Sequence, residues 1–364
     1  MFPQVTGLVM ALQILAPSPP ARAQAADPGF RVGVVSESGD IVTWFRPDGP
    51  ALVRERVVTV GMMPGDPDGP HNIAVAPDQR SYYVTLAHGV PTGSLWRFDA
   101  STDSVLGRAP ADMYPTTIGL TPDGDFAFVA NSDFFGLHPA TNPVTVVYTP
   151  TMRTLTSIPA CDMPHGVRVN HAGTRVYVSC MHDDAILVID PGTFRVTDRF
   201  LLGAGRHPPA DSVHAAACSP TFVSVSADDR SLYVACNAGN AVLVVDAETG
   251  RVTSHVAVGE GAYNVEPTLD GLRLLVTNKK GRSVSMVDLA TGRESARIPT
   301  TKGVVHGIAF SPDGRYAYIS AESVGSDPGS IDTIDLKTGT VAGTVAVPFH
   351  PAGITVLRSP EETP

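Results

Sequence analysis

The sequence predicts an all-β protein in which seven four-stranded blades form a closed ring. Three observations support this prediction: a sequence motif that recurs along the chain, turn residues at fixed places within each copy of the motif, and termini that each supply part of one blade. Sustained helical periodicity is absent beyond the N-terminal segment, which argues against a mixed fold.

The spacing of the recurring motif predicts the architecture. Clear copies span 69–86, 163–180 and 304–321, and weaker copies begin near Tyr114, Ser219 and Ala262. Neighbouring copies lie about 42–56 residues apart. A near-regular period of this length indicates one supersecondary unit per repeat.

Each copy predicts four short strands in the same order. In the last copy, the Pro and Gly of the turn at 311–314 separate the first strand from a β-rich strand at 316–319. A third strand ends at Asp335, and the turn at 336–339 opens a fourth strand. Four antiparallel strands per repeat are typical of a propeller blade.

The two termini complete one further blade. Six copies fill residues 69–348, while 32–35, 41–44 and 56–59 supply only three strands of another. The missing innermost strand is found at 350–356. We therefore expect the N- and C-terminal strands to pair in one blade, which closes the ring and leaves only short outer edges.

Composition limits the partners and the location of the protein. A net charge of -10 over 364 residues argues against a nucleic-acid partner, and no internal apolar run has the length of a membrane span. The apolar stretch 5–16 and the small residues at 21–25 predict a signal peptide over 1–25. The propeller would then occupy 26–364 in a periplasmic or secreted protein; a disordered N-terminal tail is the alternative.

The repeat phrase resembles that of the YVTN-type seven-bladed β-propeller family. The resemblance is carried by strand segments and turns at 82–85, 128–131, 275–278, 121–124 and 311–314. It implies the same fold over almost the whole predicted mature chain. It leaves the activity open, because propellers support many unrelated functions.

Histidines recur at one position of the repeat. The residues that open the innermost strands, in blade order, are Ala352, His71, Thr116, His165, Thr221, Tyr263 and His306. Because the innermost strands line the central channel, we expect the three histidines at one channel mouth. Converging imidazoles suit copper, zinc and iron, so the trio predicts a metal site. The alternative is that they fill a crowded polar mouth and hydrogen-bond neighbouring carbonyls.

Further polar residues are predicted at the same mouth. His88 and His182 each follow the end of a second strand, and we expect them to complete or orient the site or to transfer protons as catalytic residues. The long connection 203–220 contains His207, Asp211 and His214, which predicts a lid over the mouth.

The cysteines fall within two successive repeats. Their positions predict disulfides between Cys161 and Cys180 and between Cys218 and Cys236, as suits an exported protein. A soft copper site at 180–182 is the alternative.

Histidines gathered from several blades also resemble the propeller domain of nitrous oxide reductase. This chain departs from that family because it ends with its closing strand and has no His-His pair. We therefore do not expect nitrous oxide reduction. The resemblance implies a mononuclear or small copper site.

Together these features predict an exported, metal-dependent propeller enzyme. We expect an oxidoreductase that uses copper, iron or another divalent metal and acts on a small molecule or an exposed peptide side chain. Two alternatives stay open: a non-catalytic ligand- or protein-binding propeller, and a metal-dependent lactonase- or lyase-like propeller. The sequence does not predict the oligomeric state.

Overall fold

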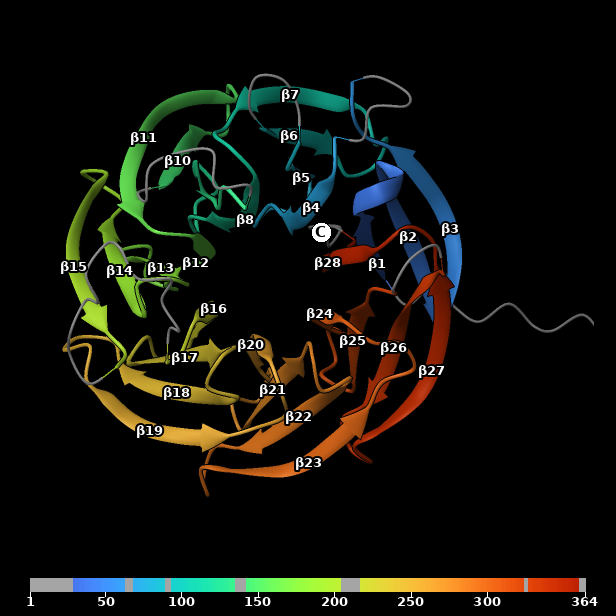
Figure 1. Cartoon of the computed structure of the whole chain (residues 1–364). Helices are drawn as coiled ribbons and strands as arrows, with labels where there is room; N and C mark the ends of the chain where they lie inside the picture. The colour runs from blue at the N-terminus through green and yellow to red at the C-terminus, as the bar shows by residue number, and fades with distance from the viewer. Residues whose placement is uncertain are drawn as a thin grey trace, which may run out of the picture.

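The structure is a computed structural model that describes residues 29–62, 68–88, 93–134, 142–203, 217–323 and 327–359. Seven four-stranded antiparallel sheets form a ring around a central channel (Figure 1). The predicted seven-bladed propeller is therefore confirmed. The predicted signal peptide and the predicted lid residues His207, Asp211 and His214 lie outside the described residues, so both stay predictions. Within those residues, no helix is long and apolar enough to cross a membrane.

Blade one joins the two ends of the chain. It contains β1 (Phe30–Ser36), β2 (Ile41–Asp48), β3 (Ala51–Thr59) and β28 (Pro351–Arg358), in the order β28-β1-β2-β3 (Figure 1). The only helical element of the described residues, the 3-10 turn η1 (Glu37–Gly39), follows β1. Strand β28 runs antiparallel to β1, with Phe30 opposite Arg358 and Ser36 opposite Pro351. The predicted closure by terminal strands is confirmed.

The other six blades follow the chain from their innermost to their outermost strands. Blades two and three contain β4 (Pro70–Val75), β5 (Ser81–Leu86), β6 (Ser94–Asp99), β7 (Val105–Pro110), β8 (Pro115–Leu120), β9 (Phe126–Asn131), β10 (Asn142–Tyr148) and β11 (Arg153–Cys161). Blades four and five contain β12 (Pro164–Val169), β13 (Val176–Cys180), β14 (Ala185–Asp190), β15 (Arg195–Leu201), β16 (Pro220–Val225), β17 (Ser231–Cys236), β18 (Ala241–Asp246) and β19 (Val252–Ala257). Blades six and seven contain β20 (Ala262–Pro267), β21 (Arg273–Asn278), β22 (Ser283–Asp288), β23 (Arg293–Pro299), β24 (Val305–Phe310), β25 (Tyr316–Ala321), β26 (Gly329–Asp335) and β27 (Thr340–Val347).

The hydrophobic core lies between neighbouring blades. Between blades one and two, the ring of Trp44 contacts the ring of Tyr82 edge-on at 5.1 Å, and Tyr82 stacks on Phe98 at 5.0 Å. The hydroxyl of Tyr82 donates to Asp103, so its polar end is also satisfied. Burial of each such ring stabilises the fold by about 1.5–3 kcal/mol. Each blade is thus held mainly by the next.

A left-handed residue precedes every innermost strand. The seven residues, with φ between 49° and 71°, are Gly69, Tyr114, Met163, Ser219, Gly261, Val304 and His350. The carbonyl of this residue accepts a backbone hydrogen bond from the residue after the second strand, as Met181 donates to Met163 at 3.0 Å. A non-glycine residue rarely adopts this conformation. Because this conformation recurs in all seven blades, the chain turns sharply into each innermost strand at the same position of the repeat.

A β-bulge follows at the second residue of each innermost strand. In blade four, Pro164 lies opposite Cys180 and Val167 opposite Val178, so His165 and Gly166 both face Ser179. The freed amide of Gly166 donates to Ser179 Oγ at 2.7 Å. The same amide-to-hydroxyl bond joins Asn72 to Thr85, Asn264 to Thr277 and Gly307 to Ser320. A bulge redirects the side chain of its extra residue, here away from the strand ladder.

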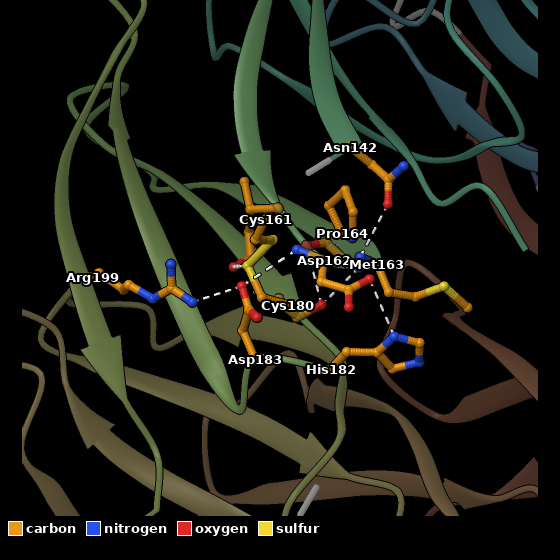
Figure 2. The surroundings of a disulfide bond; sticks show 12 residues. Asn142, Cys161, Asp162, Met163, Pro164, Cys180, His182, Asp183 and Arg199 are labelled. Atoms are coloured by element: carbon orange, nitrogen blue, oxygen red, sulfur yellow. Dashed lines mark hydrogen bonds and ion pairs between the residues drawn. A yellow bond between two sulfur atoms is a disulfide. The ribbon is translucent and has the colours of Figure 1, made fainter. Parts of the chain in front are cut away.

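The disulfides are as predicted. Cys161 bonds to Cys180 (Figure 2), and Cys218 bonds to Cys236, with Cα–Cα distances of 5.9 and 4.4 Å. The alternative copper site at 180–182 is wrong, because the sulfur of Cys180 is already covalently bonded. For the same reason, the close grouping of Cys161, Cys180 and Asp183 offers no thiolate to a metal.

We predict that the ring depends on β28. Deletion of 351–359 should abolish cooperative unfolding, since it removes buried Ala352, Ile354 and Leu357 and exposes the edge of β1. Thermal unfolding followed by circular dichroism measures this. Transfer of the same segment to the N-terminus, ahead of Gly29, should restore the transition, because Ser359 already donates a backbone hydrogen bond to Gly29. A truncated protein that melts like the full chain would contradict the prediction.

Candidate functional site

The channel mouth is formed by the bulged residues of the seven innermost strands. In blade order these are Ala352, His71, Thr116, His165, Thr221, Tyr263 and His306, and each is the second residue of its strand. All seven are buried. The ring of His71 lies 6.1 Å from that of His165 and 5.4 Å from that of His306. The structure therefore brings the three predicted histidines together from blades two, four and seven.

Tyr263 of blade six links two of these histidines. Its hydroxyl oxygen lies 3.1 Å from Nε2 of His165 and 3.0 Å from Nε2 of His306. The alignment of the repeats placed Tyr263 at the mouth, but nothing in the sequence assigned it a role. Its importance arises from contacts between blades, which no local pattern records.

Hydrogen bonding fixes where the protons lie when the rings are neutral. Nδ1 of His165 lies 3.0 Å from the carbonyl oxygen of Thr221, which only accepts, so Nδ1 carries the proton. Nε2 of His165 is then an acceptor, and the hydroxyl of Tyr263 donates to it. The Tyr263 oxygen in turn accepts from Nε2 of His306, which leaves Nδ1 of His306 without a proton.

This arrangement leaves buried ring nitrogens without hydrogen bonds. Nδ1 of His306 and both nitrogens of His71 have no hydrogen-bond partner among the residues that the structure describes. A buried polar atom without a partner is costly and uncommon in folded proteins. The channel mouth is therefore an incomplete polar network, which is a property expected of a ligand-binding site.

Burial keeps His165 and His306 neutral. Burial, with the nearby His71 and Lys279, lowers the pKa of His165 to about 3. Burial and Lys279 also hold the pKa of His306 well below its usual value. In Tyr263, burial and the charges of Glu322 and Glu37 raise the pKa well above 10, so the hydroxyl keeps its proton. Neutral imidazole is the form that binds metals.

Two carboxylates flank the cluster. Glu37 lies 3.6 Å from Nδ1 of His71 and accepts a hydrogen bond of 2.6 Å from Tyr114. Burial acts to raise the pKa of Glu37, but His71 and Tyr114 outweigh it and lower the pKa to about 2. Glu322 lies 3.8 Å from Nε2 of His306. Glu37 could not be identified from the sequence, because η1 has no counterpart in the described parts of the other repeats.

His88 and His182, the two predicted catalytic residues, differ in their position relative to the histidine cluster. The ring of His88 contacts that of Tyr114 edge-on at 5.2 Å, and Tyr114 contacts His71, so His88 borders the cluster. His182 is half exposed and its Nδ1 lies 3.2 Å from Asp162 (Figure 2). His182 has no ring contact with the three clustered histidines in the described part of the chain. The catalytic roles of both stay predictions.

The donor atoms only partly fit a metal ion as they stand. His71, His165 and His306, all described residues, do not place one ring nitrogen each within 4.8 Å of one another. By contrast, the Tyr263 oxygen lies 3.0–3.1 Å from two Nε2 atoms. Adjacent ligands of a tetrahedral ion at 2.0–2.1 Å are separated by about 3.4 Å. Nε2 of His165 and the Tyr263 oxygen are thus already neighbours, whereas His306 would have to transfer its proton to Nδ1, and His71 would have to move, to join them.

Comparison with known proteins supports the fold more than the site. No protein-family model matches the sequence. The chain is 27% identical over 293 residues to the seven-bladed beta-propeller protein Rv1057 of Mycobacterium tuberculosis, which covers 70% of this chain and 69% of that protein. The YVTN label and the likeness to nitrous oxide reductase stay predictions.

Solved structures show the same architecture. Kuenenia stuttgartiensis hydrazine synthase has a TM-score of 0.67 and 20% identity, covering 83% of this chain and 94% of that chain. A functionally unknown protein from Desulfotomaculum acetoxidans has a TM-score of 0.71 and 14% identity, covering 90% and 99%. Dihydro-heme d1 dehydrogenase NirN in complex with DHE has a TM-score of 0.57 and 16% identity, covering 93% and 77%. Likeness at this identity establishes the fold alone.

Buried neutral histidines predict how stability changes with pH. Because the pKa of His165 is about 3 in the fold and about 6.5 when unfolded, the unfolded chain binds more protons between these values. The free energy of unfolding should therefore decrease as pH falls below about 6.5, by up to roughly 1.4 kcal/mol per pH unit for this residue. Urea unfolding between pH of about 7.5 and about 5 measures the slope.

The substitution His165→Phe should reduce that slope, because it keeps an aromatic ring and removes the titrating nitrogens. The matched control is His255→Phe, at an exposed position of β19. An unchanged slope in His165→Phe would show that His165 is not held neutral by burial.

Proposed function

We propose that the histidine cluster binds a transition metal, copper or iron, and that the protein is an exported oxidoreductase acting on a small molecule at the channel mouth. His165 and His306 would supply nitrogen ligands, with Tyr263 and His71 completing the set. His88 and the carboxylates Glu37 and Glu322 would lie next to it and handle protons.

The observation that carries this proposal is the proton arrangement at the mouth. The Thr221 carbonyl holds His165 in the tautomer that presents an Nε2 lone pair to the same oxygen that His306 contacts. A hydrogen bond from the second ring nitrogen to a carbonyl is the usual way in which a metal-binding histidine is oriented. Nδ1 of His306 and one nitrogen of His71, which form no hydrogen bond with a described residue, add lone pairs that a metal would satisfy.

The residues present fit such an ion chemically. Imidazole suits copper, zinc and iron, and a bound cation would favour loss of the Tyr263 proton despite its raised pKa. When bound, copper or iron would supply one-electron chemistry. Glu322, 3.8 Å from Nε2 of His306, would accept a proton released at that nitrogen.

Export and a redox role have independent support. Two disulfides are compatible with an oxidising compartment. Among the similar folds is a dehydrogenase solved in complex with DHE, so a propeller can serve redox chemistry. That likeness is a precedent for the fold and does not identify a substrate for this chain.

Metal content tests the proposal. The purified protein, exposed to copper(II) or iron(II) and then freed of unbound ion by gel filtration, should retain about one ion per chain by mass spectrometry. The double variant His165→Ala, His306→Ala should retain less than about a tenth of that amount. Circular dichroism verifies that the variant is folded.

The control is His255→Ala, which changes an exposed histidine and should bind as the unsubstituted protein does. Equal metal retention in the double variant would overturn the proposal. A metal-free protein whose melting temperature is unchanged by chelation would also overturn it, and would favour a non-catalytic ligand-binding propeller.

A further inference from the structure

Lysine is rare in this protein and is concentrated at one place. The sequence contains four lysines, at positions 279, 280, 302 and 337. Three of them, Lys279, Lys280 and Lys302, line a single cavity of about 700 Å³. The fourth, Lys337, lies in the turn between β26 and β27. Because arginine supplies the positive charge elsewhere, this clustering marks the cavity as chemically distinct.

The cavity shares Tyr263 with the histidine cluster. Tyr263, whose hydroxyl contacts His165 and His306, lies in its wall, and Thr221, the carbonyl partner of His165, lies beside it. Apolar surface comes from Met181 and Val304. The volume is in the range that holds a small organic molecule.

The charge of this cavity is strongly positive. Arg282 joins the three lysines, and Asp327 is the one carboxylate among the described lining residues. Lys279 lies 3.5 Å from Glu322 and 4.3 Å from the centre of the Tyr263 ring, so its charge is compensated. Lys280, Arg282 and Lys302 form no ion pair with any described residue.

The positive charge of this cavity contrasts with the negative net charge of the whole chain. The net charge of the chain is -10, so a group of cations that form no ion pair with described residues, all in one concave site, contrasts with the overall charge. Concave sites with charge of one sign concentrate ligands of the opposite sign. Lysines act as movable point charges toward carboxylate or phosphate oxygens.

We infer that this lysine-lined cavity binds a small anionic molecule through a carboxylate or phosphate group held by Lys280, Arg282 and Lys302. The apolar side chains of Met181 and Val304 contact the remainder of the ligand, and Tyr263 separates it from the histidines. This inference goes beyond the proposed metal site and does not require a metal.

Binding of two simple anions tests the inference. Inorganic phosphate and succinate are titrated separately into the full chain at low ionic strength, and heat is measured by calorimetry. We expect saturable binding of at least one of these anions. The affinity should be roughly tenfold to a hundredfold weaker in the double variant Lys280→Ala, Lys302→Ala, because each substitution removes a charge-assisted hydrogen bond. The stronger of the two probes tells whether the group recognised is a phosphate or a carboxylate.

The matched control is Lys337→Ala, which removes the lysine outside the cavity and should leave binding unchanged. Both variants alter exposed or half-exposed side chains, and their melting temperatures verify folding. The inference would be overturned if neither anion bound saturably, or if the double variant bound as tightly as Lys337→Ala. Metal content measured in the same samples separates this result from failure of the metal proposal.

Discussion

The pairing of β28 with β1 is the constraint on which the rest of the structure depends. It joins the last strand of the chain to the first and completes the seventh blade (Figure 1). Only in a closed ring do the innermost strands of blades two, four, six and seven face one axis. Side chains that are far apart in the sequence, such as His165 and Tyr263, 98 residues apart, then meet by geometry.

The repeat also determines how each mouth residue is aimed. A left-handed residue precedes each mouth residue, and the mouth residue itself lies in a β-bulge. Where the mouth residue is a histidine or Tyr263, a hydroxyl on the second strand accepts a hydrogen bond from the amide that the bulge frees. Where the mouth residue is Thr116 or Thr221, the second strand has alanine and the threonine hydroxyl contacts that alanine's carbonyl. In blades two to seven, one hydroxyl therefore contacts the bulge, from either the second strand or the mouth residue.

The fold was predictable because its determinants repeat, while the site depends on residues that do not. The strand phrase, the turn at 311–314 and the split blade predicted the ring, and the alignment of innermost strands predicted that His71, His165 and His306 meet. The roles of Tyr263 and Glu37 were not predictable, since they arise from contacts between blades and from η1, which has no counterpart among the described residues of the other blades. The cationic cavity was missed because its lysines lie in two separate loops, after β21 and between β23 and β24, which no repeat pattern connects.

The central claim is that imidazoles from blades two, four and seven can share one ion with the oxygen of Tyr263. Electron paramagnetic resonance of the protein loaded with one equivalent of copper(II) tests this most directly, because nitrogen ligands split the signal. We expect splitting from several imidazole nitrogens, reduced in each of His71→Ala, His165→Ala and His306→Ala. A spectrum with oxygen ligands alone, or one unchanged by all three substitutions, would contradict the claim.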